Sequence, residues 1–244
     1  MTGQKSILSL CMVCALALSA FAAQGAAAAT STTAVTCVAG ASNDFSDNHC
    51  KTASAGGGFG HVAITENTNI KGSGGETILR STQSGINVEL KSTSLTGTGT
   101  MANSLVGEDH RASGTGVITY EGVTVKAPSG KGCEVAGGKV ITNELAATTA
   151  GQGMGLKFTP ATGETFAEFT IEGCGATEAL KALNGVYKVT GSVIGTPEGA
   201  NVNFTHAGTT AQGTLKLRGQ VAGIAGSGTE KNPTSGNAIA YTTS

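Results

Sequence analysis

The sequence predicts an all-β protein with an antiparallel β-sandwich or barrel-like fold and at most one short helix. Apolar and polar residues alternate with a period of two through much of the region 114–223. Gly, Pro or Asn interrupts the alternation at intervals of roughly 8–12 residues, as in sandwiches and barrels. Glycine supplies 38 of 244 residues and charged residues only 13 %. Such a composition suits pleated, turn-rich folds better than helical bundles.

The first 29 residues have the order of a cleaved secretion signal. Lys5 precedes an apolar run from Ile7 to Phe21, and a tract of small residues follows from Ala22 to Ala29. The run is shorter than the roughly 20 residues that span a bilayer. We therefore expect residues 1–29 to be a signal peptide and the mature protein to be secreted or held in the cell envelope, where disulfides can form.

The mature chain lacks a clear linker, so we expect one β-rich domain over residues 30–226. Two packed subdomains with a boundary near Arg111 are the alternative. Residues 227–244 contain few large apolar side chains. They are expected to form a loosely ordered tail or an edge strand.

The strands expected before residue 111 are less regular than those after it. They are Phe59–Thr65, Glu76–Arg80 and Gly85–Lys91, joined by glycine-rich stretches. Residues Ser92–Met101 are mostly Thr, Gly and Ser, which suits a flat strand.

The strands expected after residue 114 alternate clearly. They include Val117–Val125, Leu156–Phe158, Phe166–Ile171, Val186–Ile194 and Leu215–Arg218. The dipeptide Asn184-Gly185 favours a tight turn. Only Ala176–Leu183 offers a helix, about two turns long.

Four cysteines remain once the leader, with Cys11 and Cys14, is removed: Cys37, Cys50, Cys133 and Cys174. Four cysteines allow three pairings. Pairs 37–50 and 133–174 are favoured because each brackets one contiguous segment. No C-x-x-C pair survives in the mature chain, which disfavours a zinc site.

Several patterns could be sites of chemistry, and each also has a structural explanation. The polar segment Asn43–Cys50 could ligate calcium, but it lacks the acidic spacing of a calcium loop and suits a tight turn before a disulfide. Three carboxylates at every fourth position would share one solvated face of a strand: Glu164, Glu168 and Glu172. The four histidines show no metal-binding spacing and no evident nucleophilic triad: His49, His61, His110 and His206. We therefore expect no catalytic residue, cofactor or metal.

Charge and hydropathy exclude two classes of partner. The formal net charge is −1 and no basic block exists, so nucleic-acid binding has no electrostatic basis. After the leader, no apolar stretch approaches membrane-spanning length. An outer-membrane barrel would need aromatic girdles, and the chain has no Trp and three Tyr. The expected partner is an unidentified extracellular or envelope component.

A set of motifs carries a resemblance that covers most of the mature chain. The motifs are Phe45–Cys50, Pro128–Cys133, Gly138–Asn143, Gly173-Cys174, Leu183–Val193, Phe204–His206 and Gly213–Gly219. Together they resemble a group of secreted, β-rich proteins from soil actinobacteria. The resemblance implies a bacterial exported protein with paired cysteines. It carries over no catalytic or binding residue.

The function expected from the sequence is non-enzymatic: a structural, adhesive or ligand-binding protein at the cell surface or in the extracellular space. Strands rich in Gly, Thr and Ser offer neutral surfaces and edges that suit self-association or partner pairing. The alternative is an extracellular hydrolase acting on a polymer. That alternative would gain support from a histidine within hydrogen-bond reach of both a serine and a carboxylate.

Overall fold

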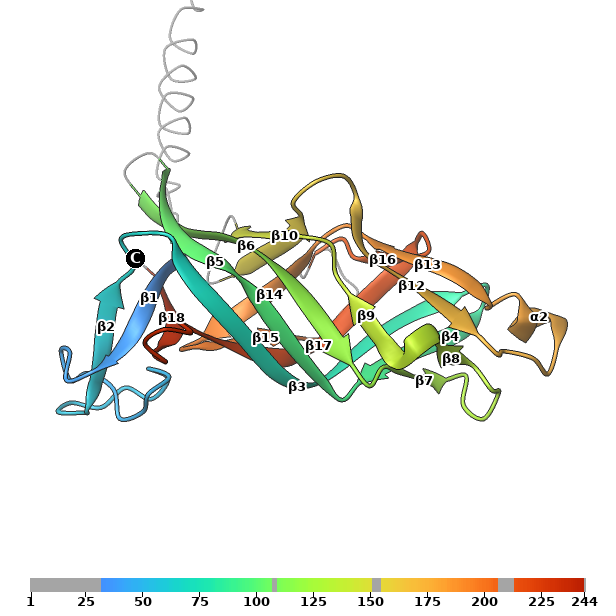
Figure 1. Cartoon of the computed structure of the whole chain (residues 1–244), viewed down its shortest axis with the longest axis horizontal. Helices are drawn as coiled ribbons and strands as arrows, with labels where there is room; N and C mark the ends of the chain where they lie inside the picture. Colours follow the sequence, from blue (N-terminus) through green and yellow to red (C-terminus); the bar gives the residue numbers. More distant parts are fainter. Residues whose placement is uncertain (1–31, 107–108, 151–154, 206–212, 244) are drawn as a thin grey trace, which may run out of the picture.

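The computed structural model describes residues 32–106, 109–150, 155–205 and 213–243. The expected signal peptide, residues 1–29, lies outside this range. The described chain is all-β and barrel-like, with one short α-helix, α2 (Glu178–Lys181), and a 3₁₀ turn, η1 (Ala136–Gly138) (Figure 1). The fold class predicted from the alternation is therefore confirmed.

Eight antiparallel strands close into a barrel at the centre of the molecule. In order around the barrel they are β3 (Thr68–Gln83), β5 (Ser94–Val106), β6 (Asp109–Glu121), β10 (Leu145–Thr149), β11 (Leu156–Pro160), β14 (Val193–Glu198), β15 (Asn201–Phe204) and β17 (Gln220–Lys231). The pairing of β17 with β3 completes the ring. Eight strands enclose an interior that side chains can just fill, or that can hold one small ligand.

A second β lobe extends from one end of the barrel, where β3, β6 and β17 continue past it (Figure 1). It contains β4 (Ile86–Ser92), β7 (Thr124–Ala127), β8 (Glu134–Val135), β9 (Lys139–Ile141), β12 (Thr165–Glu172), β13 (Gly185–Thr190) and β16 (Lys216–Leu217). Helix α2 lies at its far end. The Thr177 side chain caps this helix by accepting a hydrogen bond from the Leu180 N–H.

The other end of the barrel carries a small sheet formed by both ends of the described chain (Figure 1). Strand β1 (Thr32–Ala39) pairs with β2 (Phe59–Ala63) on one side and β18 (Ala238–Thr243) on the other. Ile239 and Ala240 of β18 are fully buried. The C-terminal segment is thus more ordered than its sequence suggests, because its small residues are held by pairing with β1 and β17.

One main hydrophobic core passes through the barrel and the second lobe, combining residues from both sides of position 111. Tyr187 anchors the second lobe without any Trp: it is fully buried and its ring stacks on Phe169, with centroids 5.7 Å apart. Its hydroxyl donates a hydrogen bond to the Leu183 carbonyl at 2.8 Å. The Arg218 guanidinium lies 5.1 Å from the Tyr187 ring centroid.

Two disulfides cross-link the outer parts of the fold, and they join the two cysteine pairs that the sequence favours. Cys37 on β1 bonds to Cys50 across a separation of 13 residues, and Cys133 bonds to Cys174 across 41. The first tethers the 40–58 loops to the small terminal sheet. The second holds the segment before β8 against the end of β12.

Strand β3 is longer than its sequence predicts, because its glycine-rich first half is also in the sheet. Residues Thr68–Gly74 pair with β5, and Lys71–Gly74 also pair with β17. Hydrogen bonds to two neighbours hold a stretch whose intrinsic strand propensity is poor.

Close backbone approach between β5 and β6 predicts a strong effect of one substitution. A Cβ at Gly99 would lie 2.1 Å from the Thr115 carbonyl oxygen, whereas a Cβ at Gly75 would meet nothing within 4 Å. We expect Gly99→Ala to lower the free energy of unfolding by about 1–3 kcal/mol. Urea unfolding of the two variants measures this, and an equal stability for Gly99→Ala and the control Gly75→Ala would contradict it.

The shorter disulfide loop yields a second prediction. Replacing both Cys37 and Cys50 by Ser should lower the free energy of unfolding by roughly 3 kcal/mol, because the unfolded chain regains loop entropy. Peptide mapping without reductant should recover the pairs 37–50 and 133–174. Any crossed pair would overturn the assignment.

Candidate functional site

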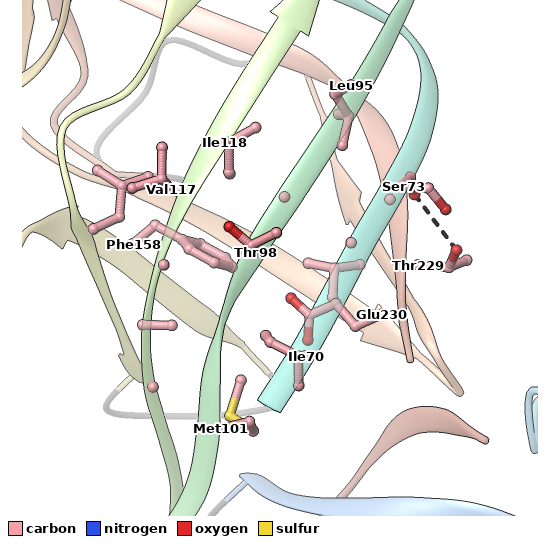
Figure 2. Close-up of a pocket in the computed structure, with 18 of the residues that line it drawn as sticks. Ile70, Ser73, Leu95, Thr98, Met101, Val117, Ile118, Phe158, Thr229 and Glu230 are labelled. Atoms are coloured by element: carbon pink, nitrogen blue, oxygen red, sulfur yellow. Dashed lines mark hydrogen bonds between the residues drawn. The ribbon is translucent and has the colours of Figure 1, made fainter. Parts of the chain in front are cut away.

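The barrel encloses an apolar cavity of about 100 Å³. Its walls come from β3, β5, β6, β10, β11, β15 and β17, so the closed barrel itself builds it. Figure 2 shows apolar side chains around this space, among them Ile70, Met101, Ile118 and Phe158. Its volume is about two-thirds that of an engineered apolar cavity of about 150 Å³ that binds benzene or xenon.

Glycines create this space. Gly72 of β3 pairs directly with Gly97 of β5, and the same cross-strand row continues to Ile118 on one side and Glu230 on the other. Directly paired residues project to the same face of a sheet, so two neighbouring positions of this inward row have no side chain. Gly228 also lines the cavity. The barrel is left partly unfilled where larger residues would close it.

A second apolar cavity of about 60 Å³ lies in the adjoining lobe. Thr77, Tyr120 and Ile224 line both cavities, so these three side chains form the boundary between them. The Thr77 hydroxyl is buried and has no hydrogen-bond partner. The backbone lets it approach β17 because Gly226, at φ 153°, sits beside it at a β-bulge.

Burial raises the pKa of Tyr120 to about 12. Its phenol therefore stays protonated across the physiological range and can act as a hydrogen-bond donor. With the unpartnered Thr77 hydroxyl, it places two polar groups at the boundary of two otherwise apolar spaces.

Glu230 is the one charged residue among the described residues that line the barrel cavity. Figure 2 shows its side chain reaching from β17 toward the interior. The Tyr241 hydroxyl on β18 donates a hydrogen bond to Glu230 Oε2. Burial raises the pKa of Glu230, and the bond from Tyr241 opposes this in part. Burial and the neighbouring carboxylate raise the pKa of Tyr241 well above its usual value, which keeps it a donor.

The polar segment before Cys50 forms the turn that its composition predicts. The Asp47 carboxylate accepts hydrogen bonds from the backbone N–H groups of His49, Lys51 and Thr52, at 2.9, 3.2 and 2.7 Å. Slight burial works to raise the pKa of Asp47, but these bonds outweigh it and lower the pKa. Backbone donors occupy both of its oxygens, as in an Asx turn.

The described histidines lie on separate segments: His49 in the turn before Cys50, His61 on β2 and His110 on β6. The His61 ring packs on Phe45 with centroids 4.4 Å apart, and its Nε2 is buried without a partner. Burial lowers the pKa of His61 and Asp44 partly opposes this. His110 is exposed, and His206 lies outside the described residues.

The three evenly spaced carboxylates are all solvent-exposed: Glu164, Glu168 and Glu172. Glu168 pairs with Lys188 of the neighbouring strand, with 3.6 Å between Oε2 and Nζ. Glu168 and Glu172 thus lie on a solvated part of β12, as the spacing predicts, whereas Glu164 lies in the bend before the strand.

The described part of the chain contains no cluster of three or more His, Cys, Asp or Glu side chains placed to hold a metal ion. Nor does any helix in it have the length and apolar character needed to cross a membrane. No protein-family model, curated protein or solved structure matches the chain. The geometry of the described residues is therefore the basis for a functional proposal.

Sequence reasoning did not find the cavity residues or Glu230. Glu230 falls in the segment expected to be a loose tail, and the paired glycines lie in stretches that look like poor strands. One feature of the sequence indicates Glu230: it is the single acidic residue in a segment of mostly small and apolar residues, Gln220–Lys231.

The raised pKa of Glu230 predicts how stability depends on pH. The folded protein binds this proton more tightly than the unfolded chain, whose Glu titrates near a pKa of roughly 4.3. The stabilisation is complete below that value and is lost as pH rises through the folded pKa. Glu230→Gln should therefore be more stable relative to wild type at neutral pH than in acid.

Urea unfolding of both proteins between about pH 3.5 and pH 8 measures this difference. Other titrating groups, Asp47 included, are present in both proteins and cancel in the comparison. A constant stability difference across the range would contradict the assignment.

Proposed function

We propose that the protein is an exported, non-enzymatic binding protein that holds a small apolar ligand inside its β-barrel. The observation that carries the proposal is the glycine-lined apolar cavity inside the eight-stranded barrel, with walls from seven of its strands. Ligand sites in proteins are mostly apolar hollows with a few placed polar groups. This cavity has that composition, with Glu230 as its charged group.

The rigidity of the closed barrel favours a ligand-binding function over a purely structural one. The barrel is closed by hydrogen-bonded pairs on every side, so the cavity is formed before a ligand arrives. A preformed site avoids the entropy of ordering loops during association. The two disulfides are further supports at the margins of the fold, and they agree with the exported location proposed from the leader.

An NMR titration of the ¹⁵N-labelled mature protein with 1-hexanol tests the proposal. Saturable shifts should centre on the amides of Gly72, Gly97 and Gly228, which line the cavity. Gly97→Val should abolish them by filling the space. A Cβ at Gly97 meets its nearest atom, the Val117 carbonyl oxygen, at 3.5 Å, so Gly97→Ala is a milder variant that fits without clash.

Gly75→Ala is the matched control, since it adds a methyl group on the same strand, β3, where nothing lies within 4 Å. It should bind hexanol as the wild type does. No saturable binding by the wild type, or undiminished binding by both Gly97 variants, would overturn the proposal.

A further inference from the structure

We infer that the ligand of the barrel cavity is an apolar amine whose ammonium group pairs with the Glu230 carboxylate. The inference rests on the proposed function and specifies the ligand's chemistry. The charge of the cavity lining supports it: the described lining residues include one acidic side chain and no basic one.

The carboxylate lies where a ligand's end group would reach it. Glu230 is in register with Gly72, and Gly72 with Gly97, so the row beside the carboxylate is free of side chains for two positions. Glu230 and Tyr241 are partly buried as a hydrogen-bonded pair, and Glu230 lines the cavity. A ligand can therefore place its head at Glu230 and its apolar body among Ile70, Met101 and Phe158.

Glu230 has hydrogen-bonding capacity left over. An ionised carboxylate offers about four acceptor positions, and the described contacts use one, from Tyr241 to Oε2. The neighbouring lysines do not neutralise it. Lys71 and Lys231 are each one residue along their strands from the Gly72–Glu230 pair, so they face the opposite, solvent side, where both are exposed.

A partly buried carboxylate without a cationic partner is unfavourable, and an ammonium ion relieves this cost while donating up to three hydrogen bonds. An alcohol could donate one hydrogen bond but would leave the charge unpaired. A carboxylic acid ligand would bring a second negative charge into the same space. The cavity therefore favours amine over alcohol and alcohol over carboxylate.

The orientation of the bound amine follows from the second cavity. Going from Glu230 along the barrel, the apolar space reaches Thr77, Tyr120 and Ile224, beyond which the second cavity begins. A longer apolar chain would extend toward this boundary, where the unpartnered Thr77 hydroxyl could receive a hydrogen bond from a polar group in the chain.

NMR titrations with hexylamine, 1-hexanol and hexanoate test the inference, because the three probes share one chain and differ in the head group. At pH 7 wild type should bind hexylamine at least tenfold more tightly than hexanoate, with hexanol between them. Glu230→Gln should reduce the preference for hexylamine over hexanol to less than about twofold. The matched control Glu172→Gln, which neutralises an exposed carboxylate on β12 outside the cavity lining, should retain the preference.

The affinity for hexylamine should also fall as the solution is acidified through the pKa of Glu230, while that for hexanol changes little. The titratable groups that face Glu230 are Tyr241 on β18 and, farther along the interior, Tyr120 on β6; β1, β5 and β15 have none. Both tyrosines have raised pKa values and stay neutral over this range.

Equal affinities of wild type for hexylamine and hexanol, or a preference that survives in Glu230→Gln, would overturn the inference while leaving the proposed function intact. Failure of all three probes to bind the wild type would overturn the proposed function itself. Binding of hexanol to the wild type therefore separates a failure of this inference from a failure of the proposed function.

Discussion

The structure depends on one steric constraint: the closed ring of eight strands fixes an interior volume that its inward-facing side chains only partly fill. Gly72 of β3 and Gly97 of β5 are cross-strand partners, and both line this interior. Gly99 on β5 and Gly116 on β6 instead allow close backbone approach, since a Cβ there would meet a carbonyl oxygen at 2.1 and 2.8 Å. Glycine thus has two separate uses in one sheet, tight coiling of the strands and vacant interior space.

The charged group of the cavity is stabilised by the small terminal sheet. Strand β18 brings Tyr241 to Glu230, and β18 is itself held between β1 and β17. The packing of both chain ends is therefore linked to the chemistry of the barrel interior. The Cys37–Cys50 disulfide secures the same sheet through β1. The disulfide at the margin of the fold therefore helps to position Tyr241, which donates a hydrogen bond to the Glu230 carboxylate in the cavity.

The sequence predicted the elements whose stabilisation is local and missed those that depend on distant pairing. In strand β12, Glu168, Phe169 and Ile171 have the burial that the alternation predicts. Phe166 departs from it: it is buried together with Ala167, although the alternation places it on the face of the exposed Glu168, and a β-bulge lies between Thr165 and Ala167. The first half of β3 and all of β18 lack such a signal, because neighbours far along the chain hold them. Glu230 pairs with Gly72, 158 positions earlier. No local pattern indicates that register, so the sequence could single out Glu230 as an isolated acidic residue but could not place it in a cavity.

Xenon binding in crystals of the mature protein tests the central claim most directly, because xenon occupies only apolar space that is empty and accessible. The account predicts a xenon atom inside the barrel beside Gly72 and Gly97, and its disappearance in Gly97→Val. Ordered water in that position, or an interior with no space for xenon in wild type, would contradict the account.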